Sequence, residues 1–185
     1  MRESVRIDAR KNVSSMSHEY VSNASERIES NLMSYLDERH LLVENETKVF
    51  IYNSYGKEVS TKHIIDSLLD RGVIVYLPIV RGMIMQAVRY THNSEVVVGD
   101  FDIIEPVGAI YDGEFDISIT PLLAYDRGLN RMGKGKGYYD RFFAGHIVHK
   151  IIGLGFKKQE VDSVFPEPHD IRLDVLVNEE EVLCE

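Results

Sequence analysis

The sequence predicts an α/β fold: a single layered domain of the Rossmann-like kind, with a mostly parallel or mixed central sheet flanked by helices. From residue 48 onward, short β-branched and apolar runs alternate with segments of helical periodicity. The chain has 185 residues, which is enough to bury one core but short for two. Residues 1–185 are therefore expected to form one domain.

One amphipathic helix is expected before that alternation begins. Apolar residues between Val21 and Leu36 recur every three or four positions, and Ser17 stands where it can cap the first turn. A buried strand is expected over Lys48–Tyr52. A second helix is expected over Thr61–Arg71, where Gly72 would end it.

The second half of the chain continues the alternation. Further strands are expected at 73–80, 83–89, 115–120, 151–156 and 175–177, with a short helix over 138–144. In layered α/β folds, ligands bind at the carboxyl ends of the strands. The loop that follows the strand at 115–120 is therefore the first place to expect a site.

Composition excludes several classes of function. The net charge is −9, so the chain is not expected to bind nucleic acid. No apolar run reaches the roughly 18–20 residues that a membrane span requires, and no apolar stretch follows the charged N-terminus. Cys184 is the single cysteine, so no intrachain disulfide is possible and the cytoplasm is the expected location. Both a monomer and a homodimer remain open.

Residues 126–141, DRGLNRMGKGKGYYDR, have the composition of a phosphate site. The segment holds four of the thirteen glycines, and its five cations against two anions give a local charge of +3. Glycine allows close approach of the backbone, and successive N–H groups can form a nest for an anion. The helix that follows directs its positive end to the same place. A polyphosphate ligand is expected here.

Two standard phosphate motifs fit this segment only in part. Residues 128–134 begin like a P-loop, but Gly135 stands where Ser or Thr would bind magnesium. Residues 133–135 begin like a dinucleotide fingerprint, but Tyr138 replaces its last glycine. A carboxylate is then needed for Mg2+, and Asp140 is the predicted ligand. The simpler alternative is a flexible surface loop with solvated lysines, which the charge reversal and the adjacent Tyr-Tyr-Asp disfavour.

The run D-x3-N-R-x-G-x-G-x-G-Y-Y-D-R over residues 126–141 resembles the signature of the 5-formyltetrahydrofolate cyclo-ligase family. The resemblance continues at Pro121 with Ala124-Tyr125-Asp126, at Pro166-x-x-His169-Asp170 with Leu173-Asp174, and at Gly56-Lys57-Glu58-Val59-x-Thr61. It spans nearly the whole chain and is looser over residues 1–47.

This resemblance implies a set of site residues. ATP would be bound by Arg131, Gly133, Lys134, Gly135, Lys136, Gly137, Tyr138 and Tyr139, together with Arg2 and Arg6. The last two lie on the family's Lys-x-x-Leu-Arg, where arginine replaces lysine at Arg2, so the assignment of Arg6 is the firmer one. Asp140 and Asp170 would bind Mg2+. Glu58 would line the folate pocket with Tyr138 or Tyr139.

Taken alone, the same residues have simpler interpretations. Asp170 could cap a turn before the last strand, and Glu58 could be a solvated loop charge. At least one of the two adjacent tyrosines should pack in the core. Met83 and Met85 belong either to the core or to an adaptable wall for the pterin ring. The seven histidines show no metal-ligand spacing and are expected to be surface or satisfied residues.

The resemblance also implies a reaction, the ATP- and magnesium-dependent conversion of 5-formyltetrahydrofolate to 5,10-methenyltetrahydrofolate with release of ADP and phosphate. The formyl oxygen would attack the γ-phosphate, and nitrogen 10 would then close the ring. Arg131, Lys134 and Lys136 are the predicted catalytic residues, because they can neutralise phosphoryl charge. Two alternatives stay open: a paralogue that uses ATP on another substrate, and a non-catalytic folate- or nucleotide-binding regulator.

Overall fold

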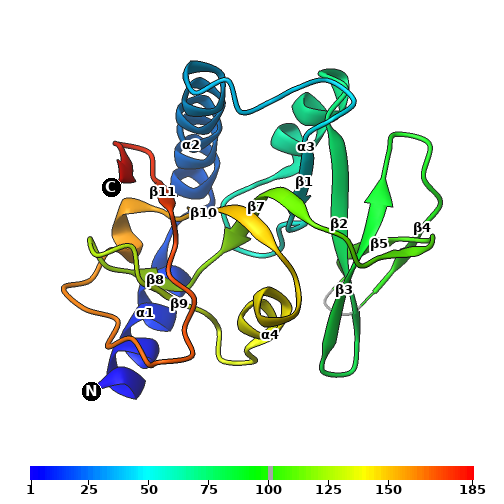
Figure 1. Ribbon diagram of the computed structural model, residues 1–185. Coiled ribbons are helices and arrows are strands. Elements are labelled where there is room, and N and C mark those ends of the chain that lie inside the picture. Colours follow the sequence, from blue (N-terminus) through cyan, green and yellow to red (C-terminus); the bar gives the residue numbers. More distant parts are fainter. Residues whose placement is uncertain (100–101) are drawn as a thin grey trace.

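The computed structural model describes residues 1–99 and 102–185, and its centre is an eight-stranded sheet (Figure 1). The strands of this sheet are β1 (Lys48–Ile51), β2 (Ile74–Arg81), β3 (Ile84–Tyr90), β6 (Ile110–Tyr111), β7 (Phe115–Pro121), β10 (Val148–Leu154), β11 (Val175–Val177) and β12 (Val182–Cys184). Their order across the sheet is β12-β11-β10-β7-β1-β2-β3-β6.

The centre of the sheet is parallel and both of its sides are antiparallel. Strands β11, β10, β7, β1 and β2 pair in parallel, whereas β12 on one side and β3 and β6 on the other pair antiparallel. The predicted fold class, a mostly parallel or mixed sheet flanked by helices, is therefore confirmed. The expected strands at 48–52, 73–80, 83–89, 115–120, 151–156 and 175–177 are all present, with boundaries shifted by a few residues.

Helices cover both faces of the sheet (Figure 1). α2 (His18–Glu38) and α3 (Lys62–Asp70) pack on one face, and α4 (Tyr138–Gly145) packs on the other. Strand β1 shows why, because successive side chains of a strand point to opposite faces. Val49 and Ile51 join the core under α2 and α3, whereas Phe50 stacks on Phe142 of α4 with ring centroids 4.3 Å apart.

The predicted helix boundaries are confirmed. The hydroxyl of Ser17 accepts a hydrogen bond from the backbone N–H of Tyr20 at 3.1 Å, which caps α2. Gly72 follows α3 with φ +71° and donates its N–H to the carbonyl of Leu69. Glycine adopts this left-handed conformation without a steric penalty.

Several short elements and one long helix were not predicted. They are α1 (Arg2–Ser15), the hairpin of β4 (Val96–Val98) and β5 (Ile104–Pro106), the hairpin of β8 (Ala124–Tyr125) and β9 (Arg131–Met132), β6, the 3-10 turn η2 (Lys157–Gln159), and β12. Helix α1 buries Ala9 and packs Val5 and Val13 beside it against Leu123 and Val164, so its apolar stripe is narrower than that of α2. Within the described ranges, no helix has both the length and the apolar character that a membrane span requires.

The two methionines before and in β3 differ. Met85 is buried on the face covered by α4. Met83 lies in the turn before the strand and is 60% exposed, so it is neither core nor pocket wall, contrary to expectation. The antiparallel register explains the difference, since pairing with β2 begins only at Ile84.

The sheet order creates a switch point between β1 and β7. From β1 the chain continues through α3 to β2 on one side, and from β7 it continues through α4 to β10 on the other. The strands β1 and β7 are neighbours, and their carboxyl ends lie at the same edge. A crevice at such a point is where open α/β sheets bind ligands.

Candidate active site

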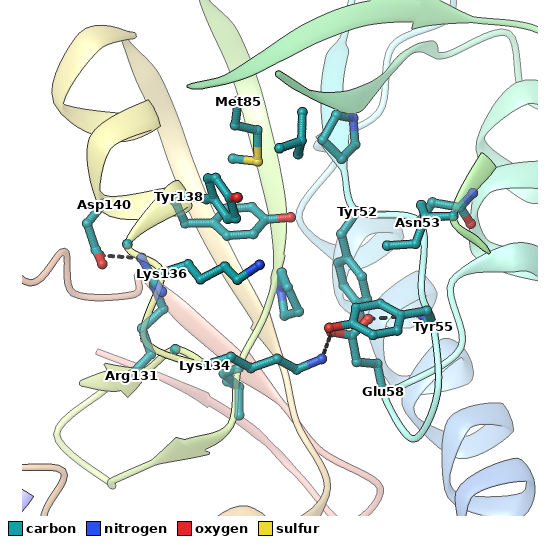
Figure 2. Close-up of a pocket in the computed structure, with 18 of the residues that line it drawn as sticks. Tyr52, Asn53, Tyr55, Glu58, Met85, Arg131, Lys134, Lys136, Tyr138 and Asp140 are labelled. Atoms are coloured by element: carbon teal, nitrogen blue, oxygen red, sulfur yellow. Dashed lines mark hydrogen bonds and ion pairs between the residues drawn. The ribbon is translucent and has the colours of Figure 1, made fainter. Parts of the chain in front are cut away.

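A pocket opens at this switch point, beyond the carboxyl ends of β1, β2 and β7 (Figure 2). It is lined by Tyr52, Asn53, Tyr55, Glu58, Pro78, Val80, Met85, Ile103, Glu105, Pro121, Leu122, Arg131, Gly133, Lys134, Lys136, Gly137, Tyr138, Tyr139 and Asp140. The expected loop after β7 is part of it. Most of the predicted site residues thus meet in one place, whereas Arg2, Arg6, Gly135 and Asp170 do not line it.

The glycine segment begins as a tight turn built on Asp126. One carboxylate oxygen of Asp126 accepts hydrogen bonds from the N–H of Gly128 at 3.0 Å and from the side-chain amide of Asn130 at 2.9 Å. The other oxygen accepts from the N–H of Val164 at 3.1 Å. Asp126 is buried, so its role is to hold the β8–β9 turn in shape.

Glycine is required where the segment enters α4. Gly137 has φ +65° and is the residue before the helix. A Cβ at this position would lie 2.9 Å from the guanidinium of Arg141. The positive φ strains any larger residue there, and Arg141 would have to shift to make room for its side chain.

Lys134 and Glu58 face each other across the pocket (Figure 2). The ammonium lies 2.6 Å from a carboxylate oxygen of Glu58 and 3.9 Å from the centroid of the Tyr55 ring. Burial lowers the pKa of Lys134, but the Glu58 carboxylate outweighs that effect and the net pKa is raised, so the lysine stays charged. The side chain of Glu58 is only 9% exposed, so the interpretation as a solvated loop charge is wrong.

Arg131 and Asp140 form a second pair. A guanidinium nitrogen of Arg131 lies 2.6 Å from the Asp140 carboxylate, and its plane lies over the rings of Tyr139 and Phe143. The Arg131 side chain is 3% exposed, and its Nε has no hydrogen-bond partner within the described structure. A buried donor without an acceptor is costly, so the contacts with Asp140 and the two rings are what hold Arg131 in place.

The two tyrosines take different surroundings. Tyr139 packs against Phe50 and Phe143, which confirms that at least one of the pair contributes to the core. Burial raises the pKa of the Tyr139 hydroxyl, and the Glu58 carboxylate raises it further. Tyr138 instead donates its hydroxyl to the carbonyl of Gly82 at 3.0 Å, which ties α4 to the β2–β3 turn.

Arg2 and Asp170 meet on the other side of the glycine segment. Arg2 donates to both oxygens of Asp170, at 2.5 and 2.9 Å, and to the carbonyl of Phe165 at 2.7 Å. The Asp170 contact is the main cause of the raised pKa of Arg2, and Glu167 and Asp140 raise it further. Asp170 also accepts from the backbone N–H of Glu167, so the expected turn-capping contact is present as well.

Arg6 approaches the glycine segment from α1. Its Nε is buried and has no partner among the described residues, and it lies 3.8 Å from the point where a Cβ of Gly135 would stand. Its terminal nitrogen pairs with Glu3 on the same helix at 2.5 Å. Arg6 is thus a second arginine close to the glycine segment.

The family model of the 5-formyltetrahydrofolate cyclo-ligases matches residues 1–179. The chain belongs to this family. Among its relatives, the 5-formyltetrahydrofolate cyclo-ligase of Haemophilus influenzae is 28% identical over 186 residues, covering 95% of this chain and 97% of that protein. The enzyme of the same name from Mus musculus is 28% identical over 177 residues, covering 85% and 86%.

A solved structure agrees with this membership. The 5,10-methenyltetrahydrofolate synthetase of Aquifex aeolicus superposes with a TM-score of 0.82 at 29% identity, covering 98% of this chain and 91% of that one. A synthetase of the same name from Mycoplasma pneumoniae is 19% identical with a TM-score of 0.75, which supports the fold alone.

The carboxylates that the family resemblance assigns to a metal divide into two places. Glu167, His169 and Asp170 offer ligand atoms that all lie within 4.8 Å of one another. Such carboxylate donors fit Mg2+, so the residues present are compatible with the ion. Asp140 lies outside this group and contacts Arg131. The sequence analysis did not predict Glu167 and His169 as metal ligands. Their close spacing with Asp170, Glu167-x-His169-Asp170, is the signal that could have identified them.

The sequence analysis also did not predict a second carboxylate that lines this cyclo-ligase pocket, that of Glu105. Glu105, on the β4–β5 hairpin, is 5% exposed, accepts from the N–H of Val80 at 2.8 Å and pairs with Arg81 at 2.6 Å. It adds to Glu58 a second acidic side chain against the apolar wall. No motif marks it, because its place depends on a short hairpin without strong periodicity.

Proposed function

We propose that this chain catalyses the ATP-dependent closure of 5-formyltetrahydrofolate to 5,10-methenyltetrahydrofolate, with ADP and phosphate as the other products. One observation carries the proposal. The cations Arg131, Lys134 and Lys136 line the same pocket as the carboxylate of Glu58. A polyanion and a reduced pterin need opposite charges, and both kinds of side chain are available within one cleft. The names of the relatives in the family support the same substrate.

The cationic side of the pocket suits a triphosphate. The glycine segment supplies backbone donors, and Lys134 and Lys136 reach into the cavity from it (Figure 2). Arg131 lines this side of the pocket and Arg6 lies close to Gly135, so both guanidinium groups add positive charge beside the segment. We therefore assign ATP to this side, with Gly133, Gly135 and Gly137 allowing its close approach.

The opposite side suits a flat heterocycle. Pro78, Val80, Met85, Pro121 and Leu122 form an apolar wall, and the rings of Tyr52 and Tyr138 lie beside it. A pterin presents N–H donors along one edge, and Glu58 is a buried carboxylate that can accept from them. We assign the folate here, with Glu58 as the orienting residue.

The reaction follows from placing these two ligands side by side. The formyl oxygen attacks the γ-phosphorus as the bond to ADP breaks, and this leaves a phosphorylated iminium. Nitrogen 10 adds its electron pair to the formyl carbon, phosphate departs with the former formyl oxygen, and nitrogen 10 loses its proton. Lys134 stays protonated, so Lys134, Lys136 and Arg131 act by neutralising phosphoryl charge rather than as bases.

Magnesium is part of the proposal. When bound, Mg2+ would shield the charge on the phosphates of ATP. Asp140 and Asp170 are the proposed ligands, and Glu167 and His169 are further donors beside Asp170. Arg131 and Arg2 each form an ion pair with one of these two aspartates.

One assay tests the activity. The protein is incubated with 5-formyltetrahydrofolate, ATP and Mg2+, and the near-ultraviolet band of methenyltetrahydrofolate is followed together with ADP. We expect both products in equal amounts. ADP release with another acceptor would favour a paralogue with a different substrate, and tight binding of both ligands without turnover would favour a regulator. Either result would overturn the proposal.

The proposal extends to the setting of the enzyme. Its ligands are small molecules, and we propose that it acts in the cytoplasm as a monomer or homodimer, without nucleic-acid or membrane partners. The lone cysteine, Cys184, is exposed near the C-terminus, which suits a reducing compartment. Light scattering on a sizing column measures the oligomeric state directly.

A further inference from the structure

Helix α1 presents three arginines at intervals of four residues, namely Arg2, Arg6 and Arg10. Residues spaced i and i+4 lie one above the other on the same helix face. Like charges in such positions repel one another, so a column of three cations needs partners. The family resemblance assigns Arg2 and Arg6 to ATP, and it gives no role to Arg10.

The three arginines differ in what neutralises them. Arg2 is paired with Asp170, and Arg6 is paired with Glu3. Arg10 is exposed and has no carboxylate within ion-pair distance among the described residues. Its guanidinium instead donates to the backbone carbonyl of Lys134 at 2.9 Å. That carbonyl carries no net charge, so Arg10 adds a positive charge beside the glycine segment that no ion pair among the described residues neutralises.

The contact from Arg10 reaches the segment at its centre. The same guanidinium lies 3.8 Å from the point where a Cβ of Gly135 would stand, and the Nε of Arg6 lies at the same distance. Lys134 is thus held by its backbone from α1, while its side chain extends into the pocket toward Glu58. Arg10 therefore connects α1 to the residue that spans the pocket.

We propose that Arg10 is a positioning residue for nucleotide binding. By docking the backbone of Lys134 on α1, it holds the glycine segment and Arg6 together as one anion site and adds a positive charge next to it. The inference rests on the proposed function, because it assigns the triphosphate to this segment. It predicts that loss of Arg10 weakens the nucleotide and leaves the folate side intact.

The test compares Arg10→Met and Arg10→Lys with a control, Lys11→Met, which removes a cation from the neighbouring, exposed position of the same helix. Calorimetry with a non-hydrolysable ATP analogue and Mg2+ measures nucleotide affinity, and separate titrations measure affinity for 5-formyltetrahydrofolate. We expect Arg10→Met to weaken the nucleotide about tenfold and to raise the KM for ATP with little change in kcat. Arg10→Lys should recover part of the loss, and Lys11→Met should match the wild type.

Two results would overturn the assignment of Arg10. One is nucleotide affinity within twofold of the wild type in a folded Arg10→Met protein. The other is an equal loss of affinity for both ligands together with a lower Tm, which would mean that Arg10 only stabilises the fold. Failure of the proposed function would give a different result. The wild-type protein itself would then bind no nucleotide or form no methenyl product.

Discussion

The ammonium of Lys134 lies 2.6 Å from the carboxylate of Glu58, and this ion pair joins the two sides of the pocket. The residues are 76 positions apart, one in the loop after β1 and the other in the segment before α4. In the proposed complex, Lys134 binds phosphate and Glu58 binds folate. Binding of either ligand would therefore break the ion pair between Lys134 and Glu58.

We expect this exchange to make the two ligands bind with positive coupling. A nucleotide that draws Lys134 away leaves the buried Glu58 without a cation, and the N–H donors of the folate then replace it. Folate affinity should be higher in the presence of a non-hydrolysable ATP analogue, as measured by calorimetry. The coupling should vanish in Lys134→Met, and Glu58→Gln should weaken folate by roughly 1–3 kcal/mol. Independent binding of the two ligands to the wild type would contradict this.

Lys136→Ala should weaken nucleotide binding and leave folate binding close to that of the wild type. Lys136 lines the cationic side of the pocket, and the loss of a charge-assisted contact to phosphate costs roughly 1–3 kcal/mol. Titration with the ATP analogue measures the effect. Lys62→Ala is the matched control, because Lys62 is an exposed lysine on α3. Equal nucleotide affinity in the two variants would remove Lys136 from the site.

Asp140→Asn should reduce turnover at least tenfold, about 1.4 kcal/mol of barrier, and shift the magnesium requirement to higher concentration. The aspartate is a proposed ligand and also the partner of Arg131 at 2.6 Å. Turnover is measured across a magnesium titration, alongside thermal unfolding to detect any loss caused by the unpaired arginine. Normal turnover at low magnesium would exclude Asp140 as a ligand.

The Arg2–Asp170 pair predicts a loss of stability in acid. Partial burial raises the pKa of Asp170, but hydrogen bonds from Arg2 and the backbone of Glu167 outweigh it, and the net pKa lies below its ordinary value of 3.8. A depressed pKa stabilises the fold above about pH 3.8, and this contribution disappears as the pH falls through the folded-state pKa. Asp170→Asn should therefore lower Tm at pH 7, by ~2–4 °C for each kcal/mol lost, and the difference from wild type should shrink toward pH 3.

The exposed Asp162 provides the control for this pH series. Asp162→Asn removes an aspartate from the same segment without removing a described contact of Arg2. Its Tm should follow that of the wild type at every pH. A constant difference between Asp170→Asn and wild type across the range would show that ionisation of Asp170 is not the cause.

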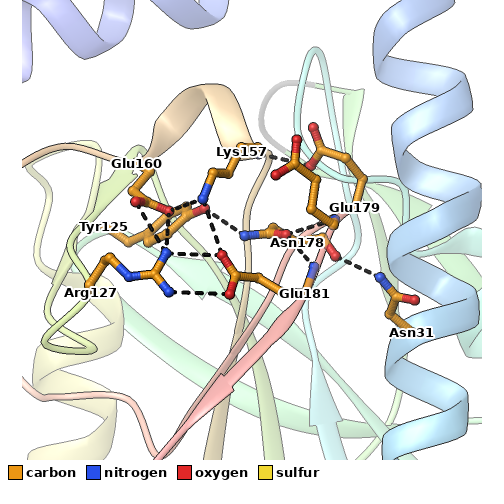
Figure 3. A network of polar contacts seen from close by, with 9 residues as sticks. Asn31, Tyr125, Arg127, Lys157, Glu160, Asn178, Glu179 and Glu181 are labelled. Atoms are coloured by element: carbon orange, nitrogen blue, oxygen red, sulfur yellow. Dashed lines mark hydrogen bonds and ion pairs between the residues drawn. The ribbon is translucent and has the colours of Figure 1, made fainter.

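A buried amide anchors the C-terminal strands (Figure 3). Asn178 is fully buried, donates to the hydroxyl of Tyr125 at 3.0 Å and accepts from the N–H groups of Glu180 and Glu181 at 2.8 Å each. Asn178→Ala should lower the free energy of unfolding by about 2 kcal/mol, because it leaves the buried Tyr125 hydroxyl and two partly buried N–H groups without this partner. Denaturant unfolding measures the loss, and Glu180→Ala, whose backbone alone takes part, should be near wild type.

Local patterns in the sequence determined the elements at the centre of this protein. The apolar run at 48–52, the run at 115–120 and the helical periodicity after Ser17 each formed the expected element, since period and capping depend on neighbours in the chain. The same holds for the glycine segment, whose composition marks it as a place for an anion whatever surrounds it. The family signature lies in the same residues.

The tertiary structure alone decided which residues meet. Glu58 reaches Lys134 because the sheet order places β1 beside β7, and Arg2 reaches Asp170, 168 positions away, because α1 packs against the C-terminal segment. Helix α1 packs through the narrow apolar stripe Val5, Ala9 and Val13, and also makes polar contacts such as that of Arg10 with the carbonyl of Lys134. The partners in such contacts could not be predicted from the sequence, because they lie far apart along the chain and meet only after the sheet has assembled.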